Sequence, residues 1–172
     1  CRCLRVEHAL QDRGAQPRAG TRVRAAIHAA IRGIKRGDVI GIIGDNRPDW
    51  VAAEIAAHAV GGMSLGMYRE SLPEEVLYLL TYGETKIVFA EDEEQVDKLL
   101  ELGDRAPHLK HIVYSDPRGM RKYERALLTE YSVLQAQGRE NEAKLRPELD
   151  KRLAAQSGAD TCAMLYTSGT TG

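Results

Sequence analysis

Residues 39–59 read VIGIIGDNRPDWVAAEIAAHA and contain the pattern that decides the fold. The run Val39–Ile43 is apolar at nearly every position, as a strand covered on both faces of a parallel sheet requires. In the turn that follows, Asn46 is the expected N-cap of a helix, with Pro48 in the first turn. The inward stripe of this helix is expected to consist of three apolar residues, Val51, Ile55 and Ala59.

Apolar runs of strand length recur on the C-terminal side of this unit. Ser71 begins a helix in which Glu74 has the capping-box spacing, and Asp92 with Gln95 repeats that pattern. Further strands are expected at residues 63–67, 86–90, 111–114 and 163–166. Strands that alternate with helices at short spacing predict an α/β fold, with a mainly parallel sheet flanked by helices.

Two segments have weaker patterns than the rest of the chain. Residues 1–20 mix Arg, Gln, Gly and Pro without periodicity, and we expect a loosely ordered lead-in there. Residues 21–33 have apolar residues at helical spacing, so the folded domain is expected to cover residues 21–172. The charged stretch 122–153 is expected to be helical in parts, with a break near Gly138 and Pro147.

Composition excludes several classes of protein. The 24 Lys and Arg residues nearly balance the 25 Asp and Glu residues, which does not favour a nucleic-acid partner. The longest apolar stretch, residues 39–44, is far shorter than the roughly 20 residues that span a bilayer, so no transmembrane segment is expected. Cys1, Cys3 and Cys162 form no even disulfide framework, which indicates reduced thiols and a cytoplasmic protein.

The segment that indicates chemistry is YTSGTTG at residues 166–172, directly after an apolar run. Two glycines allow successive backbone N–H groups to converge on phosphate oxygens, and four hydroxyls add further donors. The glycine spacing differs from that of GxxxxGK[ST], so this is not the loop of the common NTPases. The segment suits a nucleotide triphosphate.

This segment resembles the phosphate-binding signature of the adenylate-forming superfamily, in which Tyr-Thr-Ser-Gly-Thr-Thr-Gly is normally followed by Pro-Lys-Gly. Three upstream blocks resemble bacterial long-chain acyl-CoA ligases: KRGDVIGIIGDNRPDW at 35–50, AEDEEQVDKLLE at 90–101 and DPRGMRKY at 116–123. The resemblance covers residues 21–172. It implies an incomplete N-terminal subdomain of an adenylate-forming enzyme, a partial AMP-binding domain that ends in the phosphate-binding loop.

The resemblance also implies a reaction, its cofactors and its site. A long-chain fatty acid would attack the α-phosphorus of ATP, assisted by Mg²⁺, to give acyl-AMP and pyrophosphate, and CoA would then displace AMP. Thr167 would contact Mg²⁺, and the triphosphate would lie along six residues, Thr167, Ser168, Gly169, Thr170, Thr171 and Gly172. Because the later motifs of the family have no counterpart in these 172 residues, the chain alone is expected to be inactive. A membrane-peripheral location of the complete enzyme stays open.

Two other functional interpretations stay open at this stage. The first is an adenylating enzyme for a different carboxylic acid, such as an aryl or amino acid. The second is a non-catalytic α/β binding module whose Gly/Thr-rich end is only a tail.

Several other features have structural interpretations. Trp50 is expected to pack its helix against the sheet, and the acidic run 91–94 to complement a helix dipole. His108 and His111 are expected at the surface rather than on a metal. The spacing of Gly41 and Gly44 is GxxG, which does not match a dinucleotide-binding loop.

Overall fold

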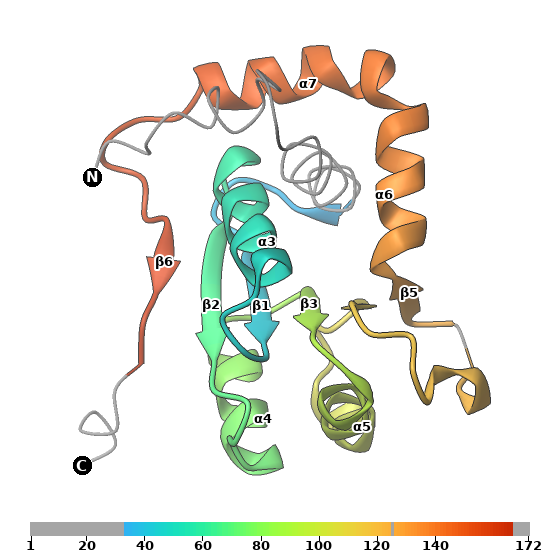
Figure 1. Cartoon of the computed structure of the whole chain (residues 1–172). Helices are drawn as coiled ribbons and strands as arrows, with labels where there is room; N and C mark the ends of the chain where they lie inside the picture. The colour runs from blue at the N-terminus through green and yellow to red at the C-terminus, as the bar shows by residue number, and fades with distance from the viewer. Residues whose placement is uncertain (1–32, 125, 167–172) are drawn as a thin grey trace.

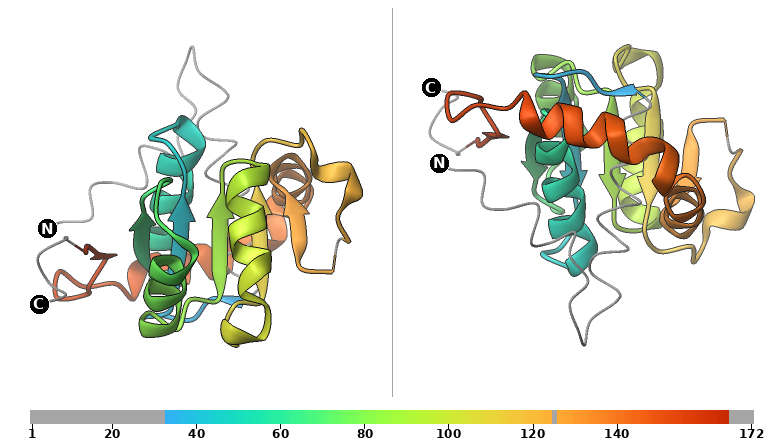
Figure 2. Two further views of the ribbon diagram at one scale, coloured as in Figure 1. Left: turned by 90° about the horizontal axis from the view of Figure 1, so that it is seen from below. Right: turned by 90° about the horizontal axis from the view of Figure 1, so that it is seen from above.

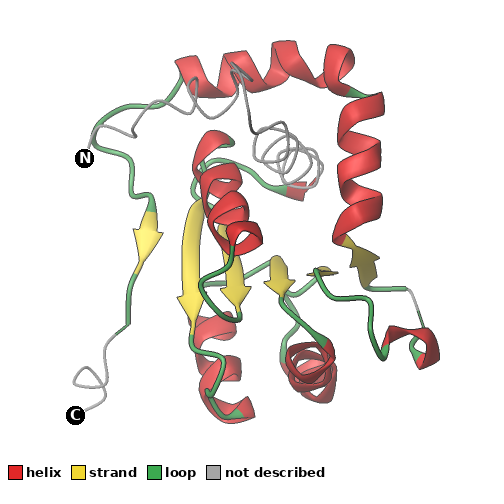
Figure 3. Ribbon diagram, viewed as in Figure 1, coloured by secondary structure: helices red, strands yellow, loops and turns green. Residues whose placement is uncertain are grey.

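The computed structural model describes residues 33–124 and 126–166, which form a parallel sheet with helices on both faces (Figures 1 and 3). The sheet has six strands in the order β5-β4-β3-β1-β2-β6, and every pair of neighbours is parallel. The strands are β1 Val39–Ile43, β2 Met63–Met67, β3 Ile87–Ala90, β4 His111–Tyr114, β5 Leu128–Glu130 and β6 Ala163–Met164. The predicted α/β class with a mainly parallel sheet is confirmed.

The helices form two layers that enclose the sheet. One layer contains α3, α6 and α7, and the other contains α4 and α5. Their bounds are α3 Pro48–Ala59, α4 Pro73–Tyr82, α5 Glu93–Leu102, α6 Tyr131–Glu140 and α7 Glu142–Ala154, with short 3₁₀ turns η1 Gly103–Arg105 and η2 Met120–Lys122. No helix in the described ranges is long and apolar enough to cross a membrane.

Two hydrophobic clusters form the core, one on each face of the sheet. On the first face, Ile40 and Ile42 of β1 pack with the alanines of α3, and Tyr131 of α6 lies edge-on to Phe89 of β3. On the second face, β1, β2 and β3 pack against Val76, Leu80, Val96, Leu99 and Leu102 of α4 and α5. Alternate residues of β1 enter opposite clusters, which explains why the whole strand is apolar.

The strand predictions hold closely in the first half of the domain and less well in the second. β2 and β4 have the expected bounds, and β3 begins one residue later than expected. β6 was expected over residues 163–166 but ends at Met164, and Leu165 is 85% exposed. β5 was not predicted, because its three residues, LTE, have no strand-length apolar run.

The start and the buried stripe of α3 differ from the prediction. Its N-cap is Arg47 rather than Asn46, and no side chain accepts a hydrogen bond there. Val51 is 46% exposed, so its predicted inward position is wrong, whereas Ala59 is buried. The buried face consists mainly of alanines, Ala52, Ala53, Ala56, Ala57 and Ala59. Because alanine is small, this face lets α3 lie close to the sheet, and Trp50 packs against the same cluster as predicted.

The capping prediction is displaced by one residue at α4 and confirmed at α5. Leu72, not Ser71, is the N-cap of α4, and its N–H donates to Glu75 Oε2 at 2.9 Å. Leucine has no side-chain acceptor, so only this half of a capping box exists. At α5, Asp92 is the N-cap and accepts from the Gln95 N–H at 3.3 Å.

A helical arm formed by α6 and α7 connects β5 at one edge of the sheet to β6 at the other. The predicted break near Gly138 and Pro147 lies between these two residues, whereas Gly138 itself is buried inside α6 and Pro147 lies inside α7. The break is at Asn141, whose side-chain amide donates to the Gln137 carbonyl at 2.8 Å. α7 crosses over α3 on the way back (Figure 2). The expected lead-in and the expected helix at 21–33 lie outside the described residues, apart from Gly33.

Candidate functional site

Because all six strands are parallel, their carboxyl ends lie together along one side of the sheet. We call this side the carboxyl edge, to distinguish it from the border strands β5 and β6. From β1 the chain passes through α3 to β2 on one side, and then through α4 to β3 on the other side of β1. The connections that leave β1 and β3 therefore go to opposite faces. This is the topological switch point of an open α/β sheet, where ligands commonly bind.

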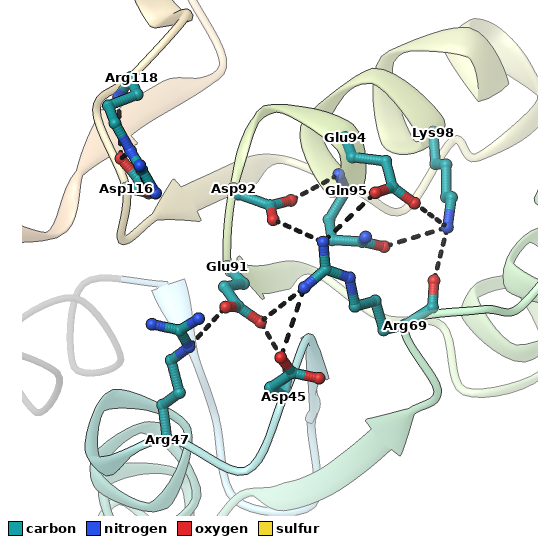
Figure 4. Close-up of polar contacts among 10 residues, drawn as sticks. All are labelled: Asp45, Arg47, Arg69, Glu91, Asp92, Glu94, Gln95, Lys98, Asp116 and Arg118. Carbon is teal, nitrogen blue, oxygen red and sulfur yellow. Dashed lines mark hydrogen bonds and ion pairs between the residues drawn. The ribbon is translucent and has the colours of Figure 1, made fainter.

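Arg69 lies at this edge, directly after β2, and is surrounded by carboxylates (Figure 4). Its Nη1 is 3.4 Å from Asp45 Oδ2 and 4.0 Å from Glu91 Oε2. Its Nη2 is 3.2 Å from Asp92 Oδ2 and 3.4 Å from Glu94 Oε2. One guanidinium thus links the residues that follow β1, β2 and β3.

Two more cations and a backbone contact complete this cluster. Arg47 Nε is 2.5 Å from Glu91 Oε1, and the other oxygen of Glu91 accepts from the Asp45 N–H at 2.6 Å. Lys98 Nζ donates to the Arg69 carbonyl at 2.5 Å. Four carboxylates therefore face three cations, which leaves no excess positive charge for a phosphate group.

The crevice at the switch point is too small for a nucleotide. Its cavity volume is about 30 Å³, with Gly44, Asp45, Glu91 and Ser115 in its wall. That is room for about one or two water molecules, whereas ligand pockets usually have about 300–1,000 Å³. Its small volume and its balanced charges indicate that the crevice connects strand ends and does not bind a nucleotide. This agrees with the sequence prediction that Gly41 and Gly44 do not form a dinucleotide-binding loop.

Two carboxyl groups at this edge have pKa values below their usual range. Hydrogen bonds from Lys98 and then Arg69 lower the pKa of Glu94. The Arg118 side chain, followed by its backbone N–H, lowers the pKa of Asp116, which follows β4. Each ion pair therefore stabilises the fold only while its carboxyl group is ionised.

We expect this edge to lose stability in acid. The Glu94 contribution is complete above the reference pKa of 4.5 and is lost as pH falls through its lower folded value, and Asp116 behaves likewise below 3.8. Urea midpoints measured from pH 7 to pH 3 should fall less steeply below pH 4.5 in Glu94→Gln than in the parent chain. An identical slope would contradict this assignment. Because the Glu94 side chain is 58% exposed, high salt should reduce the difference.

The predicted phosphate-binding residues, Thr167, Ser168, Gly169, Thr170, Thr171 and Gly172, lie outside the described residues. The strand that leads to them is described. β6 pairs with β2 in the register Ser64↔Ala163 and Leu65↔Met164, in parallel orientation. The chain therefore leaves β6 at the same edge as the other strand ends.

Tyr166, the last described residue, packs against two aromatic rings of α4. Its ring centroid is 6.5 Å from that of Tyr78 and 5.9 Å from that of Tyr82, both in edge-to-face geometry. Burial raises the pKa of Tyr166.

Sequence reasoning did not identify Arg69. A signal was present, because Arg69 follows one strand and acidic residues follow two others, and the ends of parallel strands meet. The acidic run 91–94 does begin α5 as predicted, and His108 and His111 are exposed as expected. No group of His, Cys, Asp and Glu within 33–124 and 126–166 could hold a metal ion. The predicted Mg²⁺ contact, Thr167, lies beyond those ranges.

A family model described as "AMP-binding enzyme" matches residues 20–172. A long-chain-fatty-acid–CoA ligase of Xenopus laevis, ACSBG2, is 31% identical over 141 residues, which are 81% of this chain and 18% of that protein. The ligase FadD15 of Mycobacterium bovis, of the same named type, is 30% identical over 155 residues, which are 90% of this chain and 24% of that protein. The chain thus spans about a fifth of the length of these relatives.

Two solved structures share the fold. An anthranilate CoA ligase, AuaEII, bound to anthranoyl-AMP, has a TM-score of 0.63 at 17% identity, with 90% of this chain and 27% of that chain covered. The N-terminal domain of FACL13 from Mycobacterium tuberculosis has a TM-score of 0.58 at 16% identity, with 89% and 34% covered. At these identities the likeness concerns the arrangement of the sheet and its helices.

Proposed function

The chain belongs to the family of AMP-binding enzymes, and on that premise we propose that it is part of an AMP-forming acid–thiol ligase. The complete enzyme would join a carboxylic acid to AMP, with release of pyrophosphate, and then transfer the acyl group to CoA. Since the chain matches only 18% and 24% of the two relatives, the reaction is proposed for a longer protein. The 172 residues alone are not expected to catalyse ATP–pyrophosphate exchange.

The observation that supports this function most directly is the course of the chain at β6. A strand at the border of the described sheet is followed, after Leu165, by the sequence YTSGTTG, and its carboxyl end lies at the edge where α/β folds commonly bind ligands. In this proposal the backbone N–H groups and hydroxyls of residues 167–172 bind the triphosphate and orient it. They would also offset charge that develops on the pyrophosphate leaving group.

Magnesium fits the chemistry of this segment. Mg²⁺ prefers hard oxygen ligands and usually binds through one or two protein groups together with phosphate oxygens. The Thr167 hydroxyl is the group we assign to it, as the resemblance of residues 166–172 to the signature of the adenylate-forming superfamily implies. Bound there, the ion would neutralise part of the phosphate charge. Thr167 would orient the ion relative to the nucleotide.

We propose a long-chain fatty acid as the acid substrate. The support is the name shared by relatives at 30% and 31% identity. A ligase for another acid would prefer a different substrate in the same assay. Hexadecanoate and anthranilate, compared at equal concentration in ATP–pyrophosphate exchange by the complete enzyme, distinguish the two. Greater exchange with anthranilate would overturn the fatty-acid proposal. A cytoplasmic location is part of the same proposal.

Substitution of the terminal loop tests the function directly. In the complete ligase, Thr170→Ala with Gly172→Ala should weaken ATP·Mg²⁺ binding about tenfold or more, because a donor is lost and the backbone is restricted. Isothermal titration would measure the change. Thr161→Ala with Gly158→Ala is the matched control, since both residues are exposed and a Cβ on Gly158 would meet nothing within 4 Å. A non-catalytic module with a C-terminal tail would show equal affinity in all variants.

A further inference from the structure

Strand β6 has little pairing of its own. Only two residues, Ala163 and Met164, pair with β2, and they form the border of the described sheet. So short a strand does not hold its position through ladder hydrogen bonds alone. The segment around β6 has additional contacts to β2 and to the end of α3.

The first contact involves Ser64 of β2, a hydroxyl residue only 3% exposed. Its N–H donates to the Cys162 carbonyl at 2.9 Å, and its Oγ lies 3.4 Å from the same oxygen. Ser64 Oγ is also 3.1 Å from His58 Nε2 and 3.5 Å from Glu54 Oε1, both on α3. A buried hydroxyl is thus placed between α3 and Cys162, the residue just before β6.

The proton positions in this group follow from the number of donors. Ser64 has one hydroxyl proton, and the Cys162 carbonyl and the Glu54 carboxylate can only accept. The group is satisfied when His58 Nε2 carries a hydrogen and donates to Ser64 Oγ, which then donates to one of the two oxygens. In that tautomer His58 directs the Ser64 hydroxyl toward its acceptors. Since Ser64 is buried and its oxygen is occupied, it is not placed to act as a nucleophile.

The second contact is made by Gln156, between α7 and β6. Its side-chain Nε2 donates to the carbonyls of His58 and Ala59, at 2.7 Å and 3.1 Å. These carbonyls belong to the last turn of α3, where a helix leaves its C=O groups without intrahelical partners. Gln156, which lies 97 residues after Ala59, therefore caps the C-terminus of α3. The same hydrogen bonds fix the segment that precedes β6 to the end of this helix.

Tyr166 anchors the other end of the segment, through its edge-to-face contacts with Tyr78 and Tyr82. The segment is thus held before β6 by Gln156 and Ser64, and after β6 by an aromatic contact. The predicted phosphate-binding loop begins at the next residue, Thr167.

We propose that Ser64 and Gln156, with His58 behind Ser64, are positioning residues for the nucleotide-binding loop. They hold β6 against β2 and α3, so that residues 167–172 start from a fixed strand end. None of the three residues needs to touch the nucleotide. The part of this inference that concerns ATP rests on the proposed function, whereas the part that concerns β6 does not.

The expected effect on the nucleotide follows from a two-state argument. If β6 is docked only a fraction of the time, the apparent dissociation constant is the intrinsic value divided by that fraction. Loss of both Gln156 hydrogen bonds should weaken ATP·Mg²⁺ binding by about three- to tenfold. Fluctuation at β6 should increase at the same time.

Gln156→Glu is the first test variant, because it keeps the size of the side chain and removes the amide donor. Ser64→Ala is the second. Hydrogen–deuterium exchange of the 172-residue chain, followed in a peptide over residues 161–166, should be faster in both variants. Titration of the complete ligase with ATP·Mg²⁺ should show the loss of affinity.

Two controls separate positioning from general destabilisation. Gln137→Glu makes the same chemical change on α6, which contacts the opposite edge of the sheet. Leu134→Ala removes a buried side chain of α6 and should lower the melting temperature without a change at residues 161–166. Neither control should change the affinity for ATP·Mg²⁺.

The outcomes are distinct. Unchanged exchange at residues 161–166 in both test variants overturns the inference, whatever happens to ATP. Faster exchange with unchanged ATP affinity also overturns it, since β6 would not then position the loop. If Leu134→Ala weakened ATP·Mg²⁺ binding as much as the two test variants do, Ser64 and Gln156 would contribute only to stability, and the positioning role would be wrong. A parent ligase that binds no ATP refutes the proposed function, and the exchange arm still decides whether Ser64 and Gln156 anchor β6.

Discussion

Leu65→Ala is expected to lower the free energy of unfolding by about 2–5 kcal/mol, the usual cost of a leucine truncated in a core. Leu65 is 0% exposed, lies in β2 between β1 and β6, and packs in the cluster with α4. Truncation leaves a cavity that the paired strands on both sides cannot easily close. Urea denaturation followed by circular dichroism would measure the loss.

Leu165→Ala is the matched control, because the same substitution is made at a residue that is 85% exposed. Its effect should stay within about 0.5 kcal/mol. Domains of this kind are stable by only about 5–15 kcal/mol, so Leu65→Ala alone should remove a large part of the total. Similar midpoints for the two variants would show that β2 is not central to the core.

Gly44→Ala is expected to be equally damaging, at about 2–6 kcal/mol, for a different reason. Gly44 directly follows β1 and has φ at +146°, a conformation that residues with a Cβ rarely adopt and that costs about 1–3 kcal/mol. A Cβ there would also lie 2.6 Å from Glu91 Cβ and 2.8 Å from Glu91 Oε2. Relief of that overlap requires Glu91 to move, which costs about 1–3 kcal/mol more and disturbs its contacts with Arg47 and Asp45.

Two glycines serve as graded controls for this prediction. At Gly103 φ is +48° and ψ is −130°, so alanine there should cost about 1–3 kcal/mol from backbone strain alone, because a Cβ would meet nothing within 4 Å. Gly158 has neither the unusual φ nor a close neighbour, and alanine should be nearly neutral. Chemical denaturation should therefore rank the three variants in that order. If alanine lowered the free energy of unfolding equally at Gly44 and Gly103, Glu91 would move away from the new Cβ at no measurable cost.

The parts of the fold that were predictable are those in which local pattern and tertiary packing agree. β1 is apolar at successive positions because both of its faces are covered, and that pattern is visible without a structure. The Asp92 cap was predictable because it depends on residues three apart in sequence. Val51 was misplaced because a row of alanines has almost no hydrophobic contrast, so the packing of α3 on the sheet decided which face is buried.

The candidate site shows the same division. The chemistry of residues 166–172 is local, so the sequence alone suggests a phosphate-binding loop there. Arg69, Ser64 and Gln156 act through contacts with residues far away in sequence, and nothing in their immediate neighbourhood marks them. Gln156 meets Ala59 across 97 positions, and only the fold brings the two together.

The arm of α6 and α7 gives the molecule a definite order of assembly. β1 to β4 contact one another through short connections and can form early, whereas Ser64 and Cys162 are separated by 98 positions along the chain. Contacts between such remote residues form slowly, because the chain must lose the entropy of closing a long loop before the contact can stabilise it. During synthesis on the ribosome β6 would pair with β2 only after α6 and α7 had been made, so the segment that follows β6 would take its place later than strands β1 to β4.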